Sequence, residues 1–122
     1  MKLDPEKTIN RAIALLKRNK NAFTDCDIKL ERHDKGEYNE VVRVTITDLT
    51  NNNRRAVDMR VKSFDTDDDV WKPENHPQWL EDACGANRVK APEKKVLLRF
   101  AYTLWEQWCG LDYNRKNNFV EY

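Results

Sequence analysis

Apolar residues near the start of the chain recur every three or four positions, which is the spacing of one face of a helix. This face consists of Ile9, Ala12, Ile13 and Leu16. On the opposite side lie the basic residues Lys7, Arg11 and Arg18. Asp4 fits the N-cap position and Pro5 the first turn, where a missing N–H has no cost. The pattern predicts an amphipathic helix that begins at Pro5 and turns a basic ridge away from the core.

From Asp25 onward the apolar residues alternate with polar ones, which is typical of half-buried strands. The alternation runs through the stretches CDIKLER, VVRVTITDL and AVDMRVKSF. Gly36 in the first link and the asparagines of residues 51–53 in the second favour tight turns. The sequence therefore predicts a three-stranded antiparallel meander with one apolar face.

After residue 64 the alternation stops, and Pro73 and Pro77 indicate a loop. The stretch PQWLEDACG is typical of a short helix with Gly85 just past its end. A last long helix is predicted from Pro92 to Gly110. The following tail keeps several apolar and aromatic residues, so an extra C-terminal strand and a docked extension both stay open.

These elements predict an α+β fold in which the long C-terminal helix packs on the sheet. At 122 residues we expect a single domain spanning residues 1–122. The centre of the helix face is formed by Leu97, Phe100, Ala101, Leu104 and Trp108, with Leu98, Trp105 and Cys109 to one side. This apolar arc is wider than one sheet covers, so another part of the protein or a partner must pack on its edge.

The start of the chain and its cysteines bear on where the protein acts. No apolar run approaches the roughly 20 residues of a membrane-spanning helix, and Asp4 to Glu6 stand where a signal peptide has its apolar core. The three cysteines form no CxxC pair, and their odd number argues against a disulfide framework. We expect a cytoplasmic protein without membrane contact and with reduced thiols.

Charge is segregated along the chain, although the formal net charge is only +1. Residues 65–82 carry seven acidic side chains against one lysine, and all four tryptophans follow residue 70. Tryptophan is enriched at interface hot spots, and neighbouring acids can meet a basic partner. The sequence therefore predicts a protein-binding surface made of Asp67, Asp68, Asp69, Trp71, Trp79 and Trp105.

The function that the sequence favours is a small non-enzymatic binding protein. Such proteins act through protein–protein contacts as inhibitors, immunity proteins or anti-defence proteins of phages and plasmids. Asp65, Asp67 and Asp69 have the spacing that begins a calcium loop, but Val70 and His76 stand where that loop needs its glycine and closing glutamate. We expect no metal, no cofactor and no catalytic residue, while self-association stays open.

The alternative is an RNA- or DNA-binding module. The order helix, three antiparallel strands, helix resembles the double-stranded-RNA-binding domain, and APEKKVLLRF resembles the start of its last helix, where lysines meet phosphates. The first hairpin loop, HDKGEYNE, lacks the Gly-Pro-x-His loop of that family, so the chain is not assigned to it. The candidate contacts are Lys7, Arg11, Arg18, Arg54, Arg55, Lys94 and Lys95.

A third alternative is a degenerate metal-dependent nuclease-like domain. The same order of elements resembles the restriction-nuclease-like core, in which an acid on one strand and an acid-x-lysine on the next hold a divalent ion. Asp48 and the stretch Asp58-Met59-Arg60 reproduce this spacing. Arginine stands in place of the lysine and does not give up its proton, which favours a degenerate site over an active one.

Overall fold

A computed structural model describes residues 4–34, 40–60, 77–86 and 91–113, which form six elements. They are α1 (Pro5–Lys20), β1 (Cys26–Asp34), β2 (Glu40–Asp48), β3 (Arg54–Arg60), α2 (Gln78–Ala86) and α3 (Ala91–Gly110). The predicted α+β fold with its antiparallel sheet and long C-terminal helix is confirmed. The predicted C-terminal strand falls on a tail whose residues 114–122 lie outside the described part.

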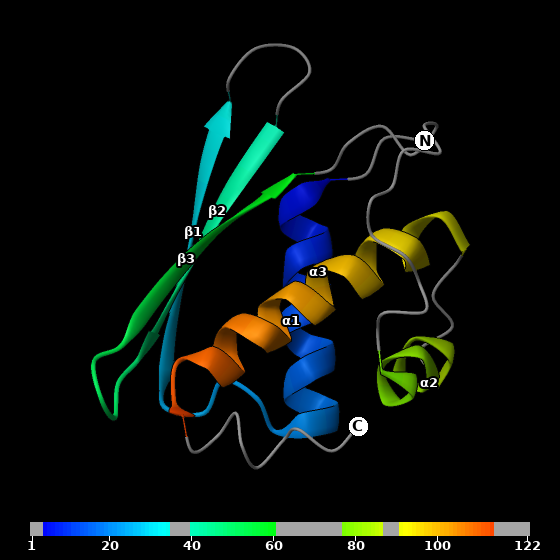
Figure 1. Ribbon diagram of the computed structural model, residues 1–122. Helices are drawn as coiled ribbons and strands as arrows, with labels where there is room; N and C mark the ends of the chain where they lie inside the picture. Colours follow the sequence, from blue (N-terminus) through cyan, green and yellow to red (C-terminus); the bar gives the residue numbers. More distant parts are fainter. Residues whose placement is uncertain (1–3, 35–39, 61–76, 87–90, 114–122) are drawn as a thin grey trace.

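The protein is built in two layers (Figure 1). One layer is the sheet, with strand order β1-β2-β3. In the other layer α1 and α3 cross each other on one face of the sheet, and α2 lies on the side of these helices that is away from the strands. Of the described elements, none covers the outer face of the sheet. No helix in the described ranges has both the length and the apolar character needed to cross a membrane.

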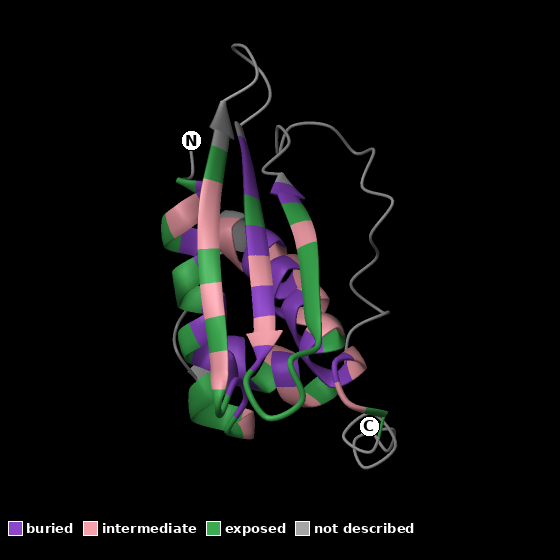
Figure 2. Cartoon of the chain, turned by 90° about the vertical axis from the view of Figure 1, so that its left-hand side faces the viewer, coloured by how far each residue is buried: buried purple, intermediate pink, exposed green. Residues whose placement is uncertain are grey.

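The sheet is a regular meander. β1 pairs with β2 from Cys26 opposite Asp48 to Asp34 opposite Glu40. The central strand β2 supplies three fully buried side chains to the inner face: Val42, Val44 and Ile46. Figure 2 shows the resulting difference between the strands, because buried residues concentrate on β2 while exposed and half-buried residues alternate along β1. The period-two pattern in the sequence is therefore the inward and outward alternation of a sheet covered on one face.

α1 begins and ends with the signals that its sequence carries. The Oδ1 atom of Asp4 accepts hydrogen bonds from the N–H groups of Glu6, at 3.0 Å, and Lys7, at 3.5 Å, as expected of an N-cap. Asn21 closes the helix in a left-handed conformation (φ 52°), and its N–H donates to the carbonyl of Lys17 at 3.1 Å. The predicted apolar face of α1 is buried.

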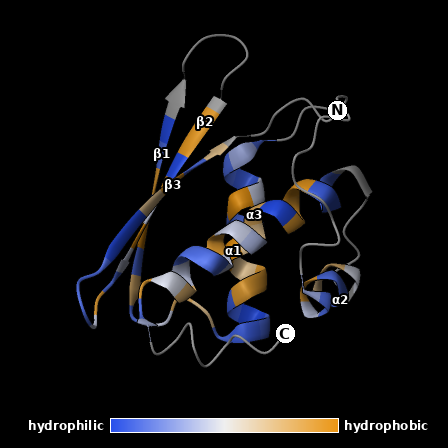
Figure 3. Ribbon diagram, in the orientation of Figure 1, coloured by the Kyte–Doolittle hydropathy of each residue, from blue (hydrophilic) through white to orange (hydrophobic). Residues whose placement is uncertain are grey.

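The wide apolar arc of α3 is covered by the protein's own helices. The predicted centre of this arc and its flank are all buried, including Leu98, Trp105 and Cys109. α1 packs along α3, and α2 packs against it as well. Figure 3 shows the apolar stretches of α1 and α3 where the two helices cross. α2 continues through Gly85 to Ala86, two residues beyond the predicted end at Cys84, because a helical glycine is tolerated and does not by itself end a helix.

A buried carboxylate organises the turn between β2 and β3. Asp48 is 0% exposed. Its Oδ1 atom accepts hydrogen bonds from the N–H of Thr50 at 2.9 Å and from the Oγ1 hydroxyl of Thr50 at 2.6 Å. Its backbone N–H donates to the carbonyl of Asn53 at 2.8 Å, and Asn52 takes a positive φ of 62° that asparagine tolerates. The carboxylate thus holds the turn in one shape.

We expect Asp48→Ala to lower the free energy of unfolding by about 1–2 kcal/mol, because the buried site loses an acceptor that serves two donors. Asp48→Asn keeps an oxygen acceptor in the same place and should lose clearly less. Urea unfolding followed by circular dichroism measures both. Equal stability of the alanine variant and the parent protein would contradict this role.

Candidate functional site

Trp79, Trp105 and Trp108 form an aromatic row between the helices. The ring centroids of Trp79 and Trp105 lie 5.2 Å apart, those of Trp105 and Trp108 lie 5.4 Å apart, and Phe23 meets Trp108 edge-on at 5.9 Å. Trp105 is only 1% exposed, so its indole belongs to the core and offers a partner no surface. Trp79 is half-buried and keeps an accessible part. The other predicted contact residues, 67–69 and 71, lie outside the described residues.

Trp79 combines a contact between its ring and a lysine with a buried N–H group. The Nζ atom of Lys20 lies 4.6 Å from the centroid of the Trp79 ring, which is within the range of a cation–π contact. The Nε1–H group of Trp79 is buried and makes no hydrogen bond to any residue that the structure describes. Burying an N–H without an acceptor opposes folding. The indole of Trp79 therefore contributes through its ring, which packs beside Trp105 and contacts Lys20.

The candidate nucleic-acid contacts do not come together on one surface. Lys7, Arg11 and Arg18 are exposed along α1, as the ridge predicts. Lys94 and Lys95 lie at the start of α3, whereas Arg54 and Arg55 begin β3 near its other end. At about 1.5 Å per residue, Lys94 and Gly110 are roughly 24 Å apart along α3. Arg54 and Arg55 are therefore well separated from Lys94 and Lys95.

Two of these cations have carboxylate partners where the three helices meet. Arg11 forms an ion pair with Glu93, and Lys94 forms one with Glu81 of α2. The hydrogen bond to Glu81 raises the pKa of Lys94 above its ordinary value. Because both ion pairs join helices at this junction, they support a structural role for Arg11 and Lys94.

Cys84 lies in the same junction, and its thiol has low reactivity. It is fully buried, and burial raises the pKa of its thiol from 9.0 to about 11, although the nearby Lys94 acts in the opposite direction. All three cysteines are free thiols, with Cys109 buried and Cys26 half-buried. A thiol that stays protonated is a poor nucleophile and a poor metal ligand.

The two acids of the nuclease-like alternative are far apart. Asp48 points to the buried face of β2, whereas Asp58 lies opposite Arg43 on the outer face. Five residues of strand separate their positions, or about 17 Å at 3.4 Å per residue. Arg43 binds Asp58 through two contacts, Nε to Oδ1 at 2.9 Å and Nη2 to Oδ2 at 3.4 Å, and this hydrogen bonding raises the pKa of Arg43. These carboxylates do not form a shared metal site. Within the ranges described, no cluster of three or more His, Cys, Asp or Glu side chains could hold a metal ion.

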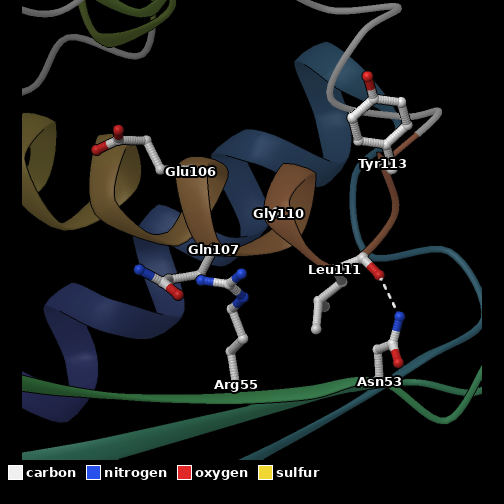
Figure 4. A pocket seen from close by; sticks show the side chains of 7 residues that line it. All are labelled: Asn53, Arg55, Glu106, Gln107, Gly110, Leu111 and Tyr113. Carbon is white, nitrogen blue, oxygen red and sulfur yellow. Dashed lines mark hydrogen bonds between the residues drawn. The ribbon is translucent and has the colours of Figure 1, made fainter.

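A pocket of about 500 Å³ opens where the turn between β2 and β3 meets the end of α3 (Figure 4). It is lined by Asn53, Arg55, Glu106, Gln107, Gly110, Leu111 and Tyr113. The Nδ2 group of Asn53 donates to the carbonyl of Leu111 at 2.8 Å, and that of Asn51 does so at 3.3 Å. These bonds tie the chain after α3 to the sheet. The pocket is consequently built on two fixed elements.

Arg55 enters this pocket from the inner side of the sheet. It lies opposite the buried Ile46, and its guanidinium is so close to Gly110 that a Cβ atom there would lie 3.4 Å from Cζ. A cation is favoured at the C-terminal end of a helix, which gives Arg55 a structural role beside α3. The same position leaves a guanidinium at the pocket, where it can also meet a ligand.

The two exposed large apolar side chains of the described residues lie at this end of the domain. Tyr113 is 78% exposed and Leu49 is 59% exposed. Leu49 belongs to the turn between β2 and β3, and Tyr113 follows the segment that this turn holds. We call Leu49, Asn53, Arg55, Gln107 and Tyr113 the end surface. Sequence patterns singled out only Arg55, because nothing in the chain order indicates that the turn at residues 49–53 lies at the end of α3.

The chain matches no protein-family model, and comparison with curated proteins and with solved structures finds no significant match. The class of the protein is therefore defined by its own geometry, as a two-layer α+β domain with an end surface and a helix-covered sheet.

Two substitutions of Trp79 separate the contribution of its ring from that of its N–H group. Trp79→Phe keeps the ring packing and removes the N–H that has no acceptor, so we expect a free energy of unfolding within about 1 kcal/mol of the parent value. Trp79→Ala removes the half-buried ring and should lose about 2–3 kcal/mol. Urea unfolding of both variants measures the difference. A phenylalanine variant as unstable as the alanine variant would show that the indole N–H is bonded after all.

A second prediction concerns the thiol of Cys84. In the folded protein at neutral pH we expect a thiol reagent to modify the buried Cys84 only on unfolding. The raised pKa also makes stability depend on pH: between 9.0 and about 11 the unfolded chain loses the Cys84 proton while the folded chain keeps it. The stabilising contribution is therefore present below pH 9.0 and is lost as the pH rises towards 11. Cys84→Ala should flatten this part of the stability profile, and an unchanged profile would contradict it.

Proposed function

We propose that the protein is a small non-enzymatic binding protein that acts in the cytoplasm through protein–protein contacts. Inhibitors, immunity proteins and anti-defence proteins of phages or plasmids are the kind of protein that we have in mind. The observation that carries the proposal is the end surface, where Tyr113 is 78% exposed beside a pocket.

The composition of the end surface supports protein binding. Tyrosine and arginine are among the residue types that dominate interface energetics, and both occur here. Tyr113 supplies a large amphipathic ring with few torsions to immobilise, and Leu49 adds exposed apolar area in the turn between β2 and β3. The hydrogen bonds of Asn51 and Asn53 to Leu111 hold the two sides together before binding. A preformed surface loses less conformational entropy when it binds.

The pocket gives the end surface its specificity. Its volume of about 500 Å³ is large enough for an anchoring side chain of a partner. Arg55 offers a guanidinium, and Gln107 and Tyr113 offer further polar groups. Residues 67–71, with their acids and Trp71, stay a second proposed contact segment on the grounds of their composition.

Nucleic-acid binding has weaker support and stays the alternative. Lys7 and Arg54 are exposed, which such binding requires. Arg11 and Lys94, however, already have carboxylate partners, and Arg54 is well separated from Lys94. Binding to phosphates would depend steeply on salt, which distinguishes this alternative from protein binding.

The test is a pull-down from host-cell lysate with the full chain, run with and without nuclease and at two salt concentrations. We compare the parent protein with the double variant Leu49→Ser/Tyr113→Ser and with Lys17→Ser, a matched change at an exposed position of α1. We expect a protein partner that survives nuclease and higher salt, that the double variant loses at least tenfold, and that Lys17→Ser keeps. Both altered side chains are mostly exposed, so the fold should survive, as circular dichroism can verify.

Two results would overturn this proposal. Recovery of nucleic acid alone, lost at the higher salt, would favour the alternative. A protein partner that is unaffected by the double variant but lost with Trp71→Ala would move the contact to residues 67–71 and away from the end surface.

A further inference from the structure

β1 is an edge strand whose free side offers backbone hydrogen-bonding groups. The Leu49 N–H donates to the Asp25 carbonyl at 2.8 Å, which places residue 25 in a hydrogen-bonded pair with β2. Along an antiparallel pair such residues alternate with ones whose N–H and C=O point the other way. Ile28 and Leu30, with the opposite parity, therefore direct these groups to the free edge. Figure 2 shows β1 at the margin of the sheet, with no described strand beyond it.

Some of the usual protections of an edge strand are missing from this part of β1. Natural edges are blunted by proline, bulges, inward-pointing charges or charged side chains such as lysine, and of these Cys26 to Leu30 has only the charged outer side chains Asp27 and Lys29. Between Cys26 and Leu30 the chain has neither proline nor glycine, and the pairing register with β2 is unbroken. The opposite edge, β3, is shorter and carries an inward-facing charge at Arg55. In β1 the inward positions from Cys26 to Leu30 carry no charge, and the inward charge comes only after them, at Arg32.

The inward side chains of β1 leave an apolar row partly uncovered. Cys26, Ile28 and Leu30 pack against the core but are only half-buried, whereas their neighbours on β2 are fully buried. α1 packs against β2. A strand added at the edge would bury the rest of this row, which is the driving force for edge pairing.

The sequence of β1 is self-complementary in one register. If two copies pair antiparallel with Ile28 at the centre, Cys26 meets the partner's Leu30 and Ile28 meets the partner's Ile28 on the inner face. On the outer face Asp27 meets the partner's Lys29, and the symmetry repeats this pair. Apolar residues thus face apolar ones, and opposite charges face each other, on both sides of the sheet.

Neighbouring registers with the same hydrogen-bond parity fit less well. A shift of two residues towards Arg32 places Lys29 opposite the partner's Lys29 and Asp27 opposite the partner's Glu31, so like charges meet at these outer positions. A shift of two residues the other way places Asp27 opposite the partner's Asp27. A shift of four residues places Ile28 opposite the partner's Arg32, which breaks the apolar match. The chain turns out of the strand at Asp25, where φ is 50°, so the favoured pairing ends there.

We propose that two copies of this chain associate through their β1 edges, with Ile28 opposite the partner's Ile28, into one six-stranded antiparallel sheet. The two-fold axis stands perpendicular to the sheet, so both helical layers lie on the same face. The association is isologous and closed, as in most homodimers. This surface lies outside the end surface, and the inference does not depend on the proposed function.

The test uses two charge variants on the exposed face of β1. Asp27→Lys gives a chain with two cations, and Lys29→Asp gives one with two anions, at the positions that face each other. Each variant alone should dimerise at least tenfold more weakly than the parent protein, because like charges meet twice. An equal mixture should restore dimers, since every pair is then complementary. Sedimentation velocity over a wide range of concentrations measures the mass of the parent, of each variant and of the mixture.

A second pair of variants separates the two edges. Ile28→Lys puts two cations at the two-fold axis and should leave only monomers. Val57→Lys makes the same change at a half-buried inward position of the opposite edge strand, β3, and should leave the dimer unchanged. The proposal is overturned by a parent protein that stays monomeric at every concentration, by a dimer that Val57→Lys disrupts as strongly as Ile28→Lys, or by a mixture of the charge variants that stays monomeric.

Discussion

The crossing of α1 and α3 over the central strand is the contact on which the rest of the structure depends. α1 packs against the central strand β2, α3 packs against β3, and the two helices also pack against each other. The helices therefore cross and bury part of their apolar surface against each other, with Ile9 and Leu16 of α1, and Leu97 and Leu104 of α3, almost wholly inaccessible. This is why α3 carries a wider apolar arc than a sheet alone requires.

The crossing also decides where the charged and polar groups gather. The start of α3 is brought to α1 and α2, so that Arg11 meets Glu93 and Lys94 meets Glu81. The end of α3 is brought to the turn between β2 and β3, where two asparagines hold the carbonyl of Leu111. One helix thus ends in a network of ion pairs and, at its other end, in a pocket beside exposed apolar side chains. The end surface lies at the second of these ends, the C-terminal end of α3.

The end surface and the β1 edge are neighbours that differ in character. They are linked by the hydrogen bond from the Leu49 N–H to the Asp25 carbonyl, at the point where β1 begins. The end surface offers side chains of the types that anchor protein partners, whereas the edge offers mainly backbone groups and an apolar row. A small domain with one helical layer can present both because its helices leave the edge strand half-covered.

The sequence alone determined the elements of this protein, because apolar periodicity and capping residues act over a few neighbouring positions. The N-cap at Asp4, the three alternating strands and the buried face of α3 could all be predicted in this way. Only the tertiary structure decided the roles of particular side chains. Trp105 is core because α2 contributes Trp79 beside it, and Leu49 and Tyr113 share one end because the asparagines of a turn bind a carbonyl some sixty residues away. Such contacts depend on how the elements cross, which no local pattern records.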